Sequence, residues 1–327
     1  MKKIILYFSF FLFLIAACKK ENLPVDEYTL EIPKGFPKPT IPENNLPNAA
    51  RIELGRRLFF DPILSRDSSI SCASCHHTDK KFTDGLAKSI GIENRIGIRN
   101  APSLLNVAYQ PTMFWDGGVP NLEQQILAPI ESHFEMDFNI IDVVARMNNS
   151  ESYKALSLKA YDQLPSIFSV TRAIACFERT LYSGTSKYDD YVYNNNKNAL
   201  TASEINGMNI FFGEEGECFH CHGTYLFTDN SFKNNGIYLQ YQDSGRAHIT
   251  QFPSDVGKFK VPSLRNVAMT APYMHDGSFA TLEDVVEHYN SGGKAHPNKS
   301  GLLLPLNLTT QEKIDLVNFL KALTDEK

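Results

Sequence analysis

Two copies of the pattern Cys-x-x-Cys-His constrain this chain more than any other feature of its sequence. They are "CASCH", which starts at Cys72, and "CFHCH", which starts at Cys218. The pattern is the attachment sequence of c-type haem. The two thiols can each add to a vinyl group of one porphyrin, and the histidine that follows then lies beneath the iron as its proximal ligand. The sequence therefore predicts two covalently bound c-type haems, with attachment and ligation by Cys72, Cys75, His76, Cys218, Cys221 and His222.

The N-terminus predicts export. "MKKIILYFSFFLFLIAAC" has two lysines, an apolar run from Ile4 to Ala17 and then a cysteine, and the run is shorter than the roughly 18 residues of a spanning helix. Its last residues resemble a bacterial lipoprotein signal, which would make Cys18 a lipidated residue. A plain signal peptide with an incidental cysteine is the alternative. Residues 1–18 are thus expected to be the signal, and the proline-rich residues 19–50 a tether, on the periplasmic side of the cell envelope.

Charge and cysteine spacing exclude other classes of protein. The formal net charge is -5, and no basic block follows the first few residues, so a nucleic-acid partner is not expected. Six cysteines in an exported chain would normally suggest disulfides. One Cys-x-x-Cys-His alone could also be a redox dithiol or half of a zinc site, but two copies in one exported chain disfavour both alternatives.

The chain also contains an internal repeat. "PSLLNVAYQPTMFWDGGVPNLE" (102–123) aligns without a gap with "PSLRNVAMTAPYMHDGSFATLE" (262–283). A helical stretch of one pattern, "ELGRRLFF" or "INGMNIFF", precedes each haem motif, and no alternating strand pattern of useful length is present. The last helical stretch resembles the C-terminal helix of small cytochromes c. We therefore expect an all-α fold of two tandem cytochrome c-like haem domains, residues 51–200 and 201–327.

The repeat predicts that the two irons differ on their open sides. Thr281 can cap a helix on which Leu282, Val286 and Tyr289 share one face, and the position equivalent to Tyr289 in the first half is Pro129. Proline has no side chain that can bind iron, so the first haem is expected to be open and the second closed by Tyr289. Tyr289 could instead be a core aromatic residue with its hydroxyl hydrogen-bonded, and His288 and His296 are weaker candidate ligands.

At this point the chain resembles the bacterial dihaem cytochrome c peroxidase and MauG family. The matching pieces are both haem motifs, "LFFDPILS", "FWDGG", "API" followed by "FEM", and "LRNVAMTAPYMHDGS". Two departures bear on mechanism. The peroxidase branch has a methionine ligand where Tyr289 stands, whereas the MauG branch has tyrosine. The peroxidase branch also has a histidine that blocks the first iron, and Ile92 takes its place here, which implies a five-coordinate first haem without prior reduction.

The resemblance also implies roles for other residues. Glu135, in "SHFEMD", matches the family's catalytic glutamate, Gln125 its distal glutamine and Trp115 the tryptophan that carries electrons between the haems. Without the family, Glu135 would be taken for a solvated loop charge and Trp115 for a core residue. The family's calcium ion would be held by oxygen donors of Asn100, Thr270 and Pro272.

The sequence thus predicts an enzyme that reduces hydrogen peroxide at the first haem. Electrons would arrive through the second haem from a small cytochrome or cupredoxin, and a second copy of the chain is a further candidate partner. The alternative is a MauG-like oxidase that oxidises another protein or an organic substrate. A dihaem electron carrier without chemistry is a third hypothesis, which Gln125, Glu135 and an unblocked iron disfavour.

Overall fold

The computed structural model describes residues 28–326, so the expected signal segment, including Cys18, lies outside the described residues. The described chain is mostly helical, as predicted. Its α-helices are α1 (Ala49–Phe60), α2 (Leu122–Gln125), α3 (Leu127–Glu131), α4 (Ile140–Asn148), α5 (Glu151–Tyr161), α6 (Ile167–Glu178), α7 (Lys187–Tyr193), α8 (Ala202–Phe212), α9 (Phe219–His222), α10 (Ala247–Thr250), α11 (Leu282–Asn290) and α12 (Thr310–Lys321). Short 3₁₀ helices are η1 (Glu43–Asn45), η2 (Pro62–Leu64), η3 (Cys72–Ser74), η4 (Thr78–Lys80), η5 (Ile92–Asn94), η6 (Val107–Tyr109), η7 (Pro253–Asp255) and η8 (Val267–Met269).

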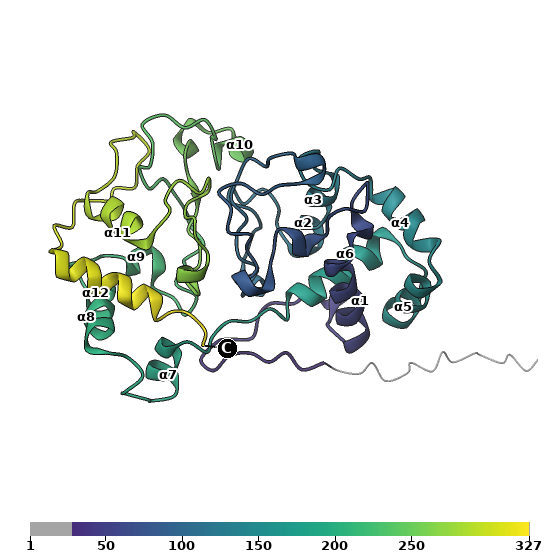
Figure 1. Cartoon of the computed structure of the whole chain (residues 1–327), viewed down its shortest axis with the longest axis horizontal. Helices are drawn as coiled ribbons and strands as arrows, with labels where there is room; N and C mark the ends of the chain where they lie inside the picture. Colours follow the sequence, from purple (N-terminus) through teal and green to yellow (C-terminus); the bar gives the residue numbers. More distant parts are fainter. Residues whose placement is uncertain (1–27, 327) are drawn as a thin grey trace, which may run out of the picture.

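The two halves of the chain lie side by side, each around its own core (Figure 1). In the first half α1 packs against α6, and in the second half α8 packs against α12. Fully buried side chains such as Leu54 and Ile174 fill the first core, and Phe211 and Phe319 fill the second. The helices "ELGRRLFF" and "INGMNIFF" therefore occupy equivalent places in the two halves.

One glycine in each half allows these helix pairs to cross closely. A Cβ added at Gly55 of α1 would lie 1.9 Å from the carbonyl oxygen of Ala173 in α6. A Cβ added at Gly207 of α8 would lie 2.0 Å from the carbonyl oxygen of Asp315 in α12. Only a residue without a side chain lets two backbones approach this closely, so the repeat preserves the same crossing in both halves.

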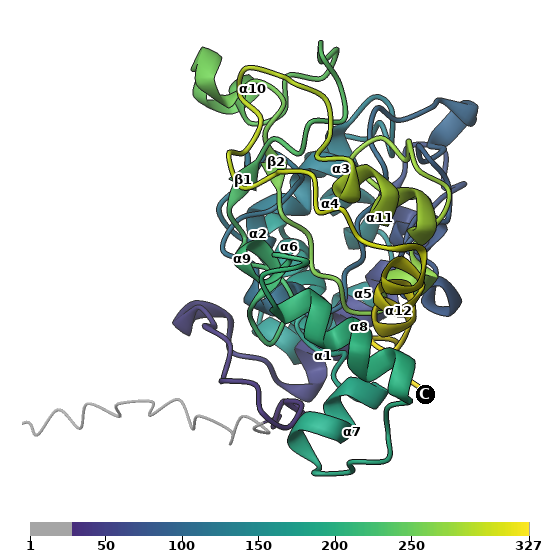
Figure 2. The same ribbon diagram turned by 90° about the vertical axis from the view of Figure 1, so that its left-hand side faces the viewer.

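Extended structure is limited to one small ladder. β1 (Phe232–Lys233) pairs antiparallel with β2 (Phe259–Lys260), with Phe232 opposite Lys260. Both strands lie at the end of the second half that is farther from α7 (Figure 2). Within residues 28–326, the structure contains no helix of the length and apolarity needed to span a membrane.

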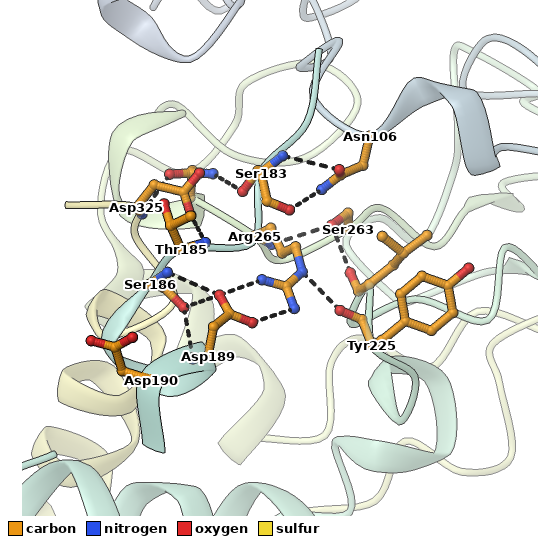
Figure 3. A network of polar contacts seen from close by, with 12 residues as sticks. Asn106, Ser183, Thr185, Ser186, Asp189, Asp190, Tyr225, Ser263, Arg265 and Asp325 are labelled. Atoms are coloured by element: carbon orange, nitrogen blue, oxygen red, sulfur yellow. Dashed lines mark hydrogen bonds and ion pairs between the residues drawn. The ribbon is translucent and has the colours of Figure 1, made fainter. Parts of the chain in front are cut away.

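A buried polar network joins α7 to the second half (Figure 3). Arg265 donates to both carboxylate oxygens of Asp189 at 2.9 Å and to the backbone oxygen of Tyr225 at 2.7 Å. Tyr188, the residue before Asp189, packs on the second core. The helix that precedes the predicted domain boundary at residue 200 therefore contacts the second half.

Two repeat-related asparagines meet on the segment between the halves. The side-chain amide of Asn106 donates to the backbone oxygen of Ser183 at 2.9 Å, and that of Asn266 donates to the Ser183 hydroxyl at 2.7 Å. Both asparagines have left-handed backbone conformations, with φ of 59° and 58°. Ser183 is thus hydrogen-bonded to equivalent positions of both halves, which fixes the linker against each of them.

The described part of the proline-rich segment is docked on the protein. Phe36 packs its ring against Tyr109 of the first half and Tyr225 of the second, at centroid distances of 5.9 and 4.9 Å. Asn45 is fully buried and donates to Glu123 at 2.7 Å. This part of the expected tether therefore contacts both halves of the protein.

Candidate active site

The first haem motif lies on a tight turn directly after a loop from α1. Ser71 begins the turn, and its backbone N–H donates to the Ser74 hydroxyl at 3.0 Å. The N–H of Cys75 and the N–H of His76 both donate to the Cys72 carbonyl, at 3.1 and 3.0 Å. The turn therefore brings the two thiols and the histidine together in one short segment.

Each motif histidine is oriented by a backbone carbonyl. His76 Nδ1 lies 2.9 Å from Phe82 O, and His222 Nδ1 lies 2.6 Å from Phe227 O. A proton on Nδ1 satisfies this contact and leaves the lone pair of Nε2 for a metal ion. Burial lowers the pKa of both histidines, which favours the neutral form that ligation requires.

The four motif thiols are not paired in disulfides. The second motif opens onto a cavity of about 310 Å³ lined by Cys218, Cys221 and His222 on one wall and by Tyr289 on another. Apolar side chains from α8, α11 and α12 complete it, among them Phe211, Val286 and Leu316. Free thiols, an oriented imidazole and an apolar cavity fit a covalently attached porphyrin. Among the described residues no group of three or more His, Cys, Asp or Glu side chains could hold a metal ion.

Tyr289 points into this cavity because α11 has the predicted pattern. The Thr281 side chain caps the helix by accepting from Asp284 N–H at 3.1 Å, and Leu282 and Val286 are buried on the same face. The Asn235 amide donates to the Tyr289 hydroxyl at 3.4 Å and to the Met274 sulfur at 3.3 Å. Burial raises the pKa of Tyr289.

The other two candidate ligands of the second iron have different surroundings. His288 Nε2 lies 2.8 Å from Asn235 O, and His296 Nδ1 accepts from the Asn298 N–H at 3.0 Å. Neither histidine is among the residues that line the cavity, within the described part of the chain. Tyr289 is therefore the candidate that the geometry favours.

The equivalent helix of the first half is broken. Asn121 caps it by accepting from Gln124 N–H at 3.0 Å, but α2 ends at Gln125 and α3 begins at Leu127. Pro129 has no N–H to donate to the carbonyl of Gln125 four residues earlier, which explains the interruption. Gln125 is half-buried, and a proline ring occupies the position that Tyr289 holds in the second half.

Glu135 lies near the first haem motif. The charge of Glu135 adds to burial in raising the pKa of Cys72 and Cys75. Its backbone oxygen accepts from the N–H of Ile92 at 3.0 Å, so the loop that carries Ile92 is fixed to the segment of Glu135. Glu135 has solvent-exposed surface, but the protein atoms packed around its carboxyl desolvate it and raise its pKa, with a partly opposing hydrogen bond from Ser132. The carboxyl is therefore suited to exchange a proton beside this motif.

Trp115 and Asn100 lie where the two halves meet. The Trp115 indole N–H donates to Asn100 O at 2.9 Å, and Asn100 N–H donates to His275 O at 2.8 Å. The side-chain amide of Asn100 donates to Leu86 O at 2.7 Å, which leaves its Oδ1 available. Thr270 and Pro272 line the same cavity as Asn100 and Trp115. The three expected calcium residues therefore line one cavity, and of these Asn100 contacts the indole.

Two buried ionisable residues near these sites were not predicted from the sequence. Glu178 is 4% exposed with its Oε2 unpartnered, and its charge raises the pKa of Cys72. Lys260 is 7% exposed and donates to Gln110 Oε1 at 3.1 Å, beside Trp115. The sequence around each residue has the pattern of an ordinary helix or loop and gives no sign of a functional role. Only the folded structure shows that both residues lie near the haem motifs.

Comparison with known proteins gives consistent matches. A family model described as di-haem cytochrome c peroxidase matches residues 49–197. The methylamine utilization protein MauG of Methylorubrum extorquens is 37% identical over 290 residues, which cover 87% of this chain and 81% of that protein. The cytochrome c551 peroxidase of Nitrosomonas europaea is 37% identical over 289 residues, covering 86% and 81%.

Solved structures agree with these matches. The crystal structure of a MauG-like protein associated with microbial copper homeostasis has a TM-score of 0.87 and 37% identity, covering 91% of this chain and 96% of that chain. The diheme peroxidase BthA of Burkholderia thailandensis has a TM-score of 0.76 at 24% identity, covering 91% and 93%, which bears on the fold alone.

Proposed function

Because this chain is an oxidoreductase that belongs to the di-haem cytochrome c peroxidase family, we propose that it reduces hydrogen peroxide to water. The reaction takes place beside Cys72–His76, and the electrons arrive through the haem at Cys218–His222. Two electrons and two protons convert one peroxide into two waters. The observation that carries the proposal is the position of Glu135 beside the first motif. Its backbone oxygen accepts from the N–H of Ile92 at 3.0 Å, and Cys75 Sγ lies 4.0 Å from the carbonyl oxygen of Ile90 in the same loop.

At the first site, the haem would be held by Cys72 and Cys75 and ligated through Nε2 of His76. When bound, its iron supplies the electrons that break the peroxide O–O bond. Glu135 takes a proton from one peroxide oxygen and returns it to the leaving oxygen, a contribution of about 10² to 10⁴ in rate for a well-placed acid-base group. The amide of Gln125 binds and orients the peroxide. Pro129 and Ile92 leave this face without a side-chain ligand.

At the second site, Cys218 and Cys221 would hold the haem, with His222 and Tyr289 as ligands. Trp115 belongs to the first half but lines the cavity of this site, and its backbone oxygen accepts from the N–H of Lys260 of the second half at 2.7 Å, which supports its role as the electron link. The donor would be a small cytochrome or cupredoxin. A calcium ion held by Asn100 Oδ1 and the carbonyls of Thr270 and Pro272 would fix this junction.

A second function is a MauG-like oxidase that removes electrons from another protein or an organic substrate. Tyr289 favours it, because phenolate is a hard anionic donor that stabilises oxidised iron, whereas a methionine ligand raises the potential. This chain is similar to a MauG-like protein associated with microbial copper homeostasis, so a process linked to copper is one candidate for its physiological role. We place the enzyme on the periplasmic side of the envelope, with Cys18 as its lipid anchor, and a homodimer as a candidate assembly.

The substitution Glu135→Gln tests the proposal in the haem-loaded protein. We expect peroxide turnover with reduced cytochrome c to fall by at least about tenfold while haem content and resting spectra stay normal. Glu131→Gln is the matched control, because Glu131 is an exposed glutamate at the end of α3 in the same segment. Equal turnover in the two variants would remove Glu135 from the mechanism.

A further inference from the structure

A row of packed rings leads from the second cavity towards the surface. Phe259 and His275 line the cavity and are stacked, with centroids 3.7 Å apart and planes 15° apart. Tyr241 lies next to both, at 6.3 Å from Phe259 and 6.4 Å from His275. Tyr238 follows at 5.5 Å from Tyr241. Electron transfer through protein slows steeply with distance, so two oxidisable tyrosines in contact carry a charge farther than one direct step.

The last tyrosine of the row has a base for its proton. The Tyr238 hydroxyl donates to Asp276 Oδ2 at 2.7 Å, whereas that of Tyr241 donates to the amide oxygen of Asn234 at 3.0 Å. A phenol gives up its electron most easily when its proton leaves at the same time. A carboxylate accepts that proton far better than an amide does, so Tyr238 is the more easily oxidised of the two.

Asp276 is ionised and able to take this proton. Burial opposes its ionisation, but the hydrogen bond from Tyr238 outweighs this and holds its pKa below the usual value. Its other oxygen, Oδ1, accepts from the Ser278 N–H at 3.2 Å. The carboxylate is therefore fixed by the backbone on one side and faces the phenol on the other.

The internal repeat shows that this pairing is particular to the second half. Asp116 is the repeat partner of Asp276, and its Oδ1 accepts from the Gly118 N–H at 2.9 Å in the same way. Its Oδ2, however, accepts from the guanidinium of Arg99 at 2.6 Å. The first half thus neutralises this carboxylate with a fixed cation, and the second half leaves it as the proton acceptor of a tyrosine.

The end of the row lies at the surface. Tyr238 is half-buried, its neighbour Leu239 is 61% exposed, and Gln240 is also exposed. The ammonium of Lys294 lies 5.5 Å from the centroid of the Tyr238 ring. A molecule in contact with this strip would therefore come within reach of the phenol without entering the cavity.

We propose that Tyr241 and Tyr238 carry oxidising equivalents from the second cavity to the surface, where Tyr238 oxidises donors that lose an electron at least as easily as a phenol. The inference rests on the proposed reaction with peroxide, which supplies the oxidant. Each peroxide takes up two electrons and two protons to give two waters. Tyr238 supplies these electrons one at a time, and each time its phenolic proton passes to Asp276. An external donor molecule then returns one electron and the proton goes back to re-form the O–H bond, so two donor molecules are oxidised for each peroxide. The two protons of the water come from solvent.

The test uses the ferric, haem-loaded protein with peroxide and a nitroso spin trap, and no reductant. Trapped radicals are located by mass spectrometry of peptides. We expect a trap adduct on Tyr238, its loss in Tyr238→Phe, and a strongly reduced yield in Asp276→Asn. Tyr191→Phe is the matched control, since Tyr191 is also half-buried with an ammonium, that of Lys197, 4.3 Å from its ring centroid. It lies on α7, at the other end of the second half (Figure 1), and its substitution should leave the adduct on Tyr238 unchanged.

Two results would overturn the inference. Adducts on other residues with none on Tyr238, or the same adduct yield at this strip in Asp276→Asn, would show that the row is only packing. Resting haem spectra verify that each variant retains both sites. If the ferric protein gives no spectral response to peroxide, the proposed function and the inference both fail; a response without an adduct on Tyr238 removes the inference alone.

Discussion

The closest backbone approach in the second half gives a sharp prediction for Gly207→Ala. The added Cβ would lie 2.0 Å from Asp315 O and 2.8 Å from the Cβ of Phe319. A backbone oxygen cannot rotate away, so α8 and α12 must separate. Overpacking costs about 1–3 kcal/mol, and we expect the upper end of this range. Alanine recovers about 1 kcal/mol through its higher helix propensity, which leaves a net loss of about 2 kcal/mol.

Thermal unfolding of the haem-loaded protein measures this loss. About 2 kcal/mol corresponds to a decrease in Tm of about 4–8 °C for a unit of 150–250 residues, followed by far-ultraviolet circular dichroism. Gly301→Ala is the matched control, because a Cβ at Gly301 meets no heavy atom within 4 Å and should leave Tm unchanged or slightly raised. The substitution Gly55→Ala should behave like Gly207→Ala. If Gly207→Ala had the same Tm as the control, the close packing of α8 against α12 would not require a glycine at this position.

Two further predictions concern buried ionisable side chains. Burial raises the pKa of Glu178 to about 8; the charge of Arg179 partly opposes this shift and the charge of Glu123 adds to it. The folded protein therefore favours the protonated carboxyl. Its contribution to stability is fully present below the unfolded pKa and is lost as pH rises towards 8, at no more than about 1.4 kcal/mol per pH unit. Urea unfolding should therefore show that Glu178→Gln flattens the fall in stability between pH 5 and 8, and an unchanged pH profile would contradict this. Tyr289→Phe should change the low-spin signals of the second haem in electron paramagnetic resonance while those of the first haem stay the same, and unchanged signals would return Tyr289 to the packing of the cavity.

The sequence predicted the features that depend on local pattern. The face formed by Leu282, Val286 and Tyr289 follows from helical periodicity and a capping threonine, and α11 places Tyr289 in the cavity. The mostly helical fold and the family are confirmed. The haem ligands, the role of Glu135, calcium and the lipid anchor stay predictions.

Long-range contacts were beyond the sequence. β1 and β2 have two residues each, too few to show alternation, and they pair across more than 20 intervening residues. The docking of Phe36 between Tyr109 and Tyr225 was equally hidden, because a proline-rich segment lacks the periodicity that reveals a buried face. The break at Ile126 could have been read from Pro129, whose missing N–H leaves the Gln125 carbonyl without its helical partner.

Divergence at equivalent positions explains how one duplicated fold could divide the work between two haems. Where the second half has Tyr289, the first has Pro129, and under the proposed function this difference decides which iron can meet peroxide. Where the first half pairs Asp116 with Arg99, the second pairs Asp276 with Tyr238, and this difference decides where an electron can leave together with a proton. Both changes leave the glycine crossings and the histidine-to-carbonyl contacts intact. Catalytic asymmetry in this architecture therefore requires few substitutions, because the helices that support the two sites do not have to change.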